Sequence, residues 1–136
     1  MFKYAVDRDR ELITLIVGPA ATADFLGRFE AEIRNTVLGH DELIILAGVS
    51  ELTGKQIEQL AFQTAQRPRE TEERESNLVL VAGTDLEFGV ARMYAAYRQK
   101  PERLTQVFRD LQQALEWLQL PGDYLKTAPF ISHPGA

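Results

Sequence analysis

The feature that most constrains the fold of this chain is an unbroken apolar run, Leu78–Ala82. It is bounded by Asn77 on one side and by Gly83 on the other. A run of this length between turn residues is typical of a strand that is buried on both faces. A doubly buried strand needs a layer of helices on each side, so the run by itself favours an α/β architecture.

A helix is predicted directly after this strand. Thr84 is a suitable N-cap, and Glu87 stands three residues later, where it completes a capping box. The helix is expected to run to about Arg98, because Pro101 cannot continue it. Strand, cap and helix therefore follow one another without a long loop.

The same order recurs along the chain. Further strands are predicted at residues 2–6, 12–17, 43–47 and 105–108, and further helices begin near residues 22–23, at Thr53 and after Asp110. The short charged connection between the first two strands favours an antiparallel hairpin. The predicted fold class is α/β: a single domain of order ββαβαβαβα, with a mostly parallel five-stranded sheet, an antiparallel N-terminal strand and four flanking helices.

Composition narrows the classes of function. The chain has 136 residues, a net charge of -5 and no cysteine. The charge does not suit a nucleic-acid-binding face, and the lack of cysteine excludes disulfides and thiolate metal sites. No apolar run approaches the roughly 20 residues of a membrane-spanning helix. We therefore expect a soluble cytoplasmic protein without a transmembrane segment.

A family resemblance rests mainly on the second half of the chain. Its residues are 89–93 (GVARM), 107–111 (VFRDL) and 114–118 (ALEWL), supported by 4–7 and 12–15 near the N-terminus. In these segments the chain resembles the SpoIIAA-like family, relatives of the STAS (sulfate transporter and anti-sigma-factor antagonist) domains with a CRAL-TRIO-like sheet. The resemblance spans nearly all of residues 1–118 and implies one such domain, with residues 119–136 as a C-terminal extension.

The resemblance does not carry over the phosphorylation switch of the anti-sigma-factor antagonists. In those proteins a helix begins with a motif of the type Asp-Ser-Ser/Thr-Gly, whose first serine is phosphorylated. If Gly54 matches the glycine of that motif, the acceptor position is Leu52, which has no hydroxyl group. Ser50 and Thr53 are nearby but out of register, and Thr53 is better explained as a helix cap.

The C-terminal extension contains prolines at positions 121, 129 and 134, which exclude a long helix. Its apolar residues suit packing over one face of the domain or onto a partner. They are Tyr124, Leu125, Phe130 and Ile131.

Arg92 is the most suggestive single residue. It lies in an otherwise apolar part of the helix that follows Gly83, near the carboxyl edge of the predicted sheet. Ligands of open α/β sheets usually bind there, and a guanidinium can hold a carboxylate or phosphate with two hydrogen bonds. The alternatives are a structural ion pair, with Asp85, Glu87 or Glu116, or an exposed arginine with a buried stem.

The candidate residues for binding a ligand or partner all lie on this helix. They are Phe88, Arg92, Met93, Tyr94 and Tyr97. Together they offer an apolar and aromatic wall. Their helical spacing is equally typical of packing against the sheet.

Catalytic, metal and cofactor chemistry is not expected. His40 and His133 are far apart and lack the spacing of metal ligands. The chain has neither a phosphate-binding loop nor a dinucleotide-binding glycine pattern. We therefore expect no catalytic residue, no metal and no cofactor.

The resemblance favours a non-catalytic binding or regulatory module that acts through contacts with a protein partner. The alternative is a carrier or sensor of a small apolar or amphipathic, lipid-like ligand, with peripheral contact to a membrane surface. A homodimer is compatible with either hypothesis, and an enzyme ranks last because no nucleophile, base and orienting group converge in the sequence.

Overall fold

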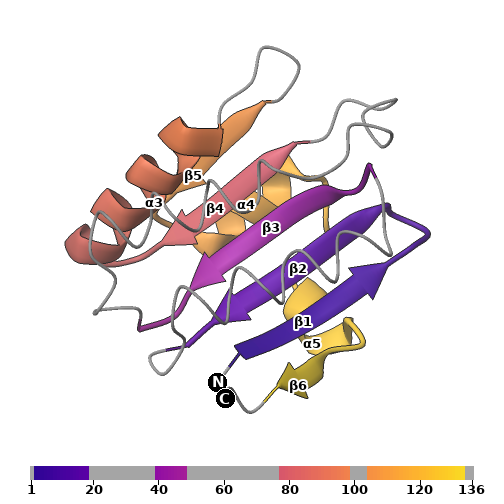
Figure 1. The fold of residues 1–136 in the computed structure, drawn as a ribbon. Helices are drawn as coiled ribbons and strands as arrows, with labels where there is room; N and C mark the ends of the chain where they lie inside the picture. Colours follow the sequence, from indigo (N-terminus) through magenta and orange to yellow (C-terminus); the bar gives the residue numbers. More distant parts are fainter. Residues whose placement is uncertain (1, 19–38, 49–76, 99–103, 134–136) are drawn as a thin grey trace.

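The computed structural model describes residues 2–18, 39–48, 77–98 and 104–133 (Figure 1). The elements along these residues are β1 (Phe2–Asp7), β2 (Leu12–Val17), β3 (Asp41–Leu46), β4 (Leu78–Ala82), α3 (Asp85–Arg98), β5 (Thr105–Phe108), α4 (Leu111–Trp117), α5 (Tyr124–Thr127) and β6 (Ile131–His133). The helices predicted to begin near residues 22–23 and at Thr53 lie outside the described residues.

The strands form one mixed sheet in the order β5-β4-β3-β2-β1-β6. Strands β2 to β5 are mutually parallel, and β1 is antiparallel to β2 in a hairpin. The predicted α/β class, the antiparallel N-terminal strand and the parallel run are therefore confirmed. The five predicted strands form, and the C-terminal extension adds a sixth: β6 pairs antiparallel with β1 over Phe2↔His133 to Tyr4↔Ile131.

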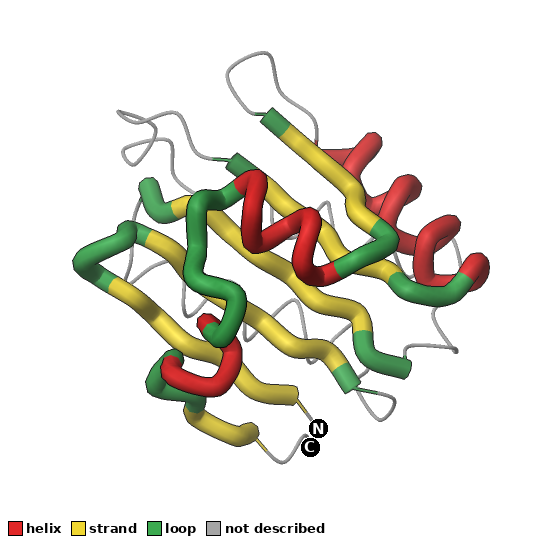
Figure 2. The backbone as a smooth tube through the Cα atoms, turned by 180° about the vertical axis from the view of Figure 1, so that it is seen from behind, coloured by secondary structure: helices red, strands yellow, loops and turns green. Residues whose placement is uncertain are grey.

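The central strand β4 is buried on both faces, as its apolar run predicts. Leu78 and Leu80 point to the face that α3 covers, where Tyr94 packs against them. Val79 and Val81 point to the opposite face, where they contact Leu115 and other residues of α4 and α5. Figure 2 shows α4 and α5 over this second face. Burial of each of these side chains contributes about 1.5–3 kcal/mol, which makes β4 the centre of the core.

The predicted capping of α3 is also confirmed. The backbone N–H of Glu87 donates to the Thr84 hydroxyl at 3.1 Å, and that hydroxyl donates to the Glu87 carboxylate at 3.0 Å. Asp110 likewise caps α4, since its side chain accepts the backbone N–H of Gln112 at 3.1 Å. Local hydrogen bonds therefore set where both helices begin.

Replacing Thr84 by alanine is expected to lower the free energy of unfolding by about 1 kcal/mol, because the Glu87 N–H loses its acceptor. Urea denaturation of the wild type, Thr84→Ala and Thr84→Ser measures this effect. The serine variant keeps the hydroxyl and should stay close to the wild type. Equal loss in both variants would show that the threonine methyl group, and not the cap, supplies the stability.

The C-terminal extension packs onto the domain. Tyr124 of α5 is 1% exposed and lies in the core cluster between the sheet and α4. Its hydroxyl is 3.3 Å from the hydroxyl of Thr14 in β2, a residue 110 positions away in sequence. Packing over a face of the domain was one of the two predicted roles of this segment, and it is confirmed for Tyr124.

Candidate functional site

The candidate site lies where β4 and β5 end and α3 begins, at the carboxyl edge of the parallel strands (Figure 1). The Thr84 cap fixes the first turn of α3 at this edge. Arg109 follows the last residue of β5 and therefore reaches the same place. This is the part of an open α/β sheet where ligands usually bind.

Phe88 stands between two arginine side chains. The Arg109 guanidinium carbon lies 5.0 Å from the centre of the Phe88 ring, and the Arg92 guanidinium carbon lies 5.9 Å from it. Both distances are within the roughly 6 Å over which a cation is attracted to a ring face. Two positively charged guanidinium groups therefore lie beside the Phe88 ring at one edge of the sheet.

Arg109 is also held by oxygen atoms at the start of α3. Its terminal nitrogen donates to the Gly83 carbonyl at 3.2 Å and to the Asp85 carboxylate at 2.8 Å. The Asp85 side chain is 96% exposed, so this ion pair lies in water and contributes little to stability. A carboxylate from another molecule can therefore take the place of Asp85 at small cost.

Arg92 is exposed, and its guanidinium group lies over the Phe88 ring. Within the described part of the chain, no hydrogen bond or ion pair involves its guanidinium group. The structural ion pairs considered for it do not form there: Asp85 pairs with Arg109, and Glu87 bonds to Thr84 and to the Gly48 amide. Its five N–H donors are thus presented to solvent beside an aromatic ring.

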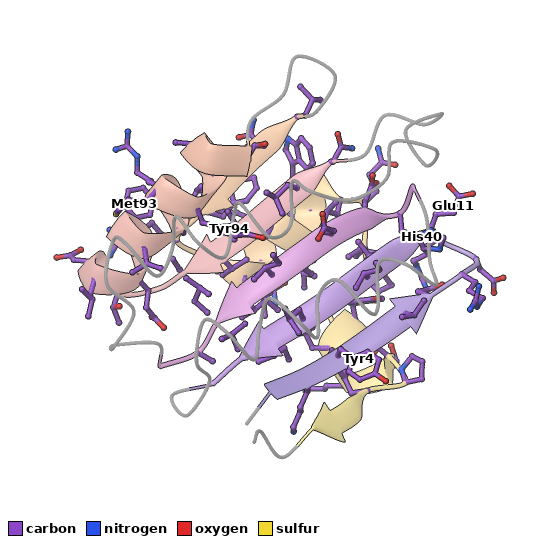
Figure 3. All side chains as sticks on the ribbon, viewed as in Figure 1. Tyr4, Glu11, His40, Met93 and Tyr94 are labelled. Carbon is purple, nitrogen blue, oxygen red and sulfur yellow. The ribbon has the colours of Figure 1, made fainter. Side chains whose placement is uncertain are left out.

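Tyr94 does not share a surface with the other candidate residues of the helix. Tyr94 is 5% exposed and packs in the core against β4, whereas Met93 is 39% exposed and points away from the sheet (Figure 3). Phe88 is half-buried and touches the same core cluster as Tyr94. The Tyr97 side chain lies outside the described part of the structure. The predicted aromatic wall is therefore not one continuous surface. Tyr94 packs in the core, which was the other interpretation of its helical spacing.

The exposed side of α3 also carries apolar groups. Leu86 is 57% exposed and Met93 is 39% exposed. Gly89 and Ala96 are exposed between and beyond them, at helical spacing. We call the surface formed by Leu86, Phe88, Arg92, Met93 and Arg109 the α3 face.

Glu87 is a buried residue that fixes the position of α3 relative to the sheet. It is 5% exposed, and its carboxylate accepts the backbone N–H of Gly48, after β3, at 2.7 Å. The carboxylate thereby ties the end of β3 to the first turn of α3. Sequence reasoning assigned Glu87 a capping role and missed this bond, because the two residues are 39 positions apart.

Arg109 was not among the predicted site residues. The signal that could have found it is its position: it directly follows β5, and β5 is parallel to β4. The carboxyl ends of parallel strands meet at one edge, so Arg109 had to lie near the start of α3. Its pairing with Phe88 depends on side-chain conformations that no sequence pattern encodes.

Other predicted groups lie elsewhere. His40 precedes β3 and lies at the end of the sheet opposite the start of α3 (Figure 3). Ser50, Thr53 and the His133 side chain are outside the described residues. Among the residues with described positions, no group of three or more histidine, aspartate or glutamate side chains could hold a metal ion.

No helix in the described ranges is long and apolar enough to cross a membrane. The comparisons of this chain with protein-family models, curated proteins and solved structures found no match. The resemblance to the SpoIIAA-like family therefore stays a prediction.

Proposed function

We propose that this protein is a non-catalytic binding module, and that its α3 face binds an acidic segment of a protein partner. The observation that carries the proposal is the Phe88 ring flanked by the exposed guanidinium groups of Arg92 and Arg109. The resemblance to SpoIIAA-like modules, which act through partner contacts, points the same way.

The chemistry of the α3 face selects carboxylates. A guanidinium group binds a carboxylate with two parallel hydrogen bonds. Stacking on an aromatic ring already restricts the arginine side chain, so that the side chain loses less conformational freedom when it binds the carboxylate. Arginine and aromatic residues are also the residue types on which binding energy concentrates in protein interfaces. Leu86 and Met93 offer exposed apolar surface on the same helix. The partner segment is therefore expected to carry aspartate or glutamate beside an apolar side chain.

The same groups argue against catalysis at this face. Arginine stays protonated at all physiological pH values, so neither guanidinium serves as a general base. The nearest buried carboxylate, Glu87, is engaged with the Thr84 hydroxyl and the Gly48 amide. These contacts are structural, and they position the helix that carries Phe88 and Arg92.

A peptide-display selection on the purified protein tests the proposal. Selected sequences should be enriched in acidic residues next to apolar ones. Their affinity for the Arg92→Glu variant should fall at least about tenfold, because one charge-assisted contact contributes about 1.5–3 kcal/mol. The matched control is Arg8→Glu, since Arg8 is an exposed arginine of the β1–β2 turn at the other end of the sheet. Selected peptides without acidic residues, or equal weakening by both variants, would refute the proposal.

The alternative function, a carrier of a small apolar or lipid-like ligand, stays a prediction. It requires a mass beyond that of the polypeptide in native mass spectrometry of the freshly purified protein. The same spectrum reports whether the chain forms a homodimer. Cytoplasmic location is likewise a prediction.

A further inference from the structure

The outer side of α3 carries four exposed residues in a heptad pattern. They are Leu86, Gly89, Met93 and Ala96. Their spacing of three, four and three residues places them in one line along the helix, on the side away from the buried Ala91 and Tyr94. A helix uses this spacing when it packs along a second helix. We call these four residues the α3 stripe.

The packing of the described residues does not require a glycine in the middle of the α3 stripe. Gly89 does not have a positive φ. Among the described residues, a Cβ atom added to it would meet nothing within 4 Å beyond the backbone of its own helix. Glycine is less favourable in a helix interior than any other residue except proline, and it is used where another backbone approaches closely. Gly89 therefore suits the crossing point of a second helix.

Two opposite charges lie seven residues apart beside the α3 stripe. Asp85 precedes Leu86 and Arg92 precedes Met93, so both charges lie on the same flank of the stripe. When two copies of this helix pack antiparallel about a two-fold axis near Gly89, residues at equal distances from the axis meet. The aspartate of each copy then faces the arginine of the other, and the leucine faces the methionine. The surface is therefore complementary to itself, as an interface between two identical patches requires.

Both charged groups are available for such a contact. The Arg92 guanidinium is exposed, and the Asp85 side chain is 96% exposed. Arg109 bonds to one carboxylate oxygen of Asp85 at 2.8 Å, and no other residue of the described part of the chain bonds to this carboxylate. The second oxygen can therefore accept a bond from the partner's Arg92 while the first stays bonded to Arg109.

We propose that the protein forms a homodimer in which α3 packs antiparallel against α3 of a second copy. This inference rests on the proposed function and names its partner, because Asp85 and Leu86 of the second copy are an acidic residue beside an apolar one. Each Asp85 carboxylate pairs with the partner's Arg92, and Leu86 contacts the partner's Met93. A contact of one helix per copy is small beside the roughly 1,200–2,000 Å² that stable interfaces bury, so we expect a dissociation constant in the micromolar range.

Sedimentation velocity of the full chain, from micromolar to near-millimolar concentration, tests for this dimer. Asp85→Arg and Arg92→Asp each place like charges opposite one another, so each variant alone should stay monomeric where the wild type dimerises. An equimolar mixture of the two should dimerise again, because every facing pair is then of opposite charge.

The control pair is Arg8→Asp and Asp123→Arg, two exposed residues outside α3 whose changes give the same net charges. Each control should dimerise like the wild type. A wild type that stays monomeric, or a mixture of the two α3 variants that dimerises no more than either alone, would overturn the proposal.

Gly89→Gln tests the crossing point. It should raise the midpoint of chemical unfolding of the monomer, because glutamine is the better helix former. It should also raise the dissociation constant of the dimer at least about tenfold, because its side chain fills the space that the partner helix needs. The control, Gly122→Gln, changes an exposed glycine of the loop between α4 and α5 and should leave the dimer unchanged. Dimerisation of Gly89→Gln at wild-type strength would contradict the assigned geometry.

The acidic peptides selected on the purified protein separate this inference from the proposed function. A monomeric wild type that still binds them through Arg92 would overturn the dimer and leave the proposed function standing. If the dimer forms, an excess of such a peptide should dissociate it, because both use the Arg92 guanidinium. A dimer that the bound peptide leaves intact would overturn the pairing of Asp85 with the partner's Arg92.

Discussion

Replacing Tyr124 by alanine is expected to lower the free energy of unfolding by about 3–5 kcal/mol, the range found when a large buried aromatic side chain is truncated. Tyr124 is 1% exposed and fills the space between α5, α4 and the sheet. Its loss leaves a cavity in the core and leaves the Thr14 hydroxyl without this partner. The C-terminal extension would then lose its main anchor.

Urea denaturation followed by circular dichroism measures this effect. Tyr124→Phe keeps the ring and loses only the bond to Thr14, so it should cost about 0.5–1.5 kcal/mol. Lys126→Ala changes an exposed residue of the same short helix and should stay within about 0.5 kcal/mol of the wild type. If Tyr124→Ala lowered the free energy of unfolding by less than Tyr124→Phe does, this result would contradict the anchoring role.

The free energy of unfolding should also fall at alkaline pH because of Tyr124. Burial raises the pKa of the Tyr124 phenol, and this outweighs the opposing effect of its hydrogen bond to Thr14. The folded state therefore favours the neutral phenol. The corresponding stability is present below the pKa of an unfolded tyrosine, near 10, and is lost as the pH rises through the higher pKa of the folded state. Unfolding free energies of the wild type and Tyr124→Phe should converge over that range; a constant difference would contradict this explanation.

Replacing Glu87 by alanine is expected to cost about 2–3 kcal/mol, because hydrogen bonds to a buried charged group are lost and the Gly48 N–H loses its acceptor. Glu87 joins the end of β3 to the first turn of α3. The variant should also weaken binding at the α3 face, since the same turn carries Phe88 and the neighbouring Asp85.

The control for this prediction is Glu116→Ala, which removes an exposed glutamate from α4. It should change the free energy of unfolding by less than about 0.5 kcal/mol. Glu87→Gln keeps one acceptor oxygen and should fall between the wild type and Glu87→Ala. Equal stability of the two alanine variants would show that the Gly48 bond contributes nothing measurable.

Local patterns predicted the elements of this fold well. The bounds of β2, β4 and β5 follow from apolar runs between turn residues, and the start of α3 follows from Thr84 and Glu87. Each of these signals acts within about four residues, so the sequence displays it directly. The parallel order followed from the alternation of strands and helices.

The C-terminal extension shows where local reasoning ends. Its prolines correctly excluded a long helix, but they gave no sign of the three-residue strand β6. That strand forms because β1, at the other end of the chain, offers an unpaired edge. The contact of Tyr124 with Thr14 has the same long-range origin.

The candidate site was predicted in part. Phe88 and Arg92 come together as expected for one helical turn, and Met93 is exposed nearby. Tyr94 turns inward because it lies on the side of α3 that faces β4. Arg109 completes the site from another strand, and only the three-dimensional arrangement brings it to Phe88.

The central claim is that the α3 face binds an acidic partner segment, and amide NMR mapping with a selected acidic peptide tests it most directly. We expect the shifts to concentrate at Leu86 to Met93 and at Arg109, and to vanish in the Arg92→Glu variant. The Arg8→Glu variant should give the wild-type pattern. Shifts centred on the β1–β2 turn or on the β6 edge, with no response of α3, would contradict the claim.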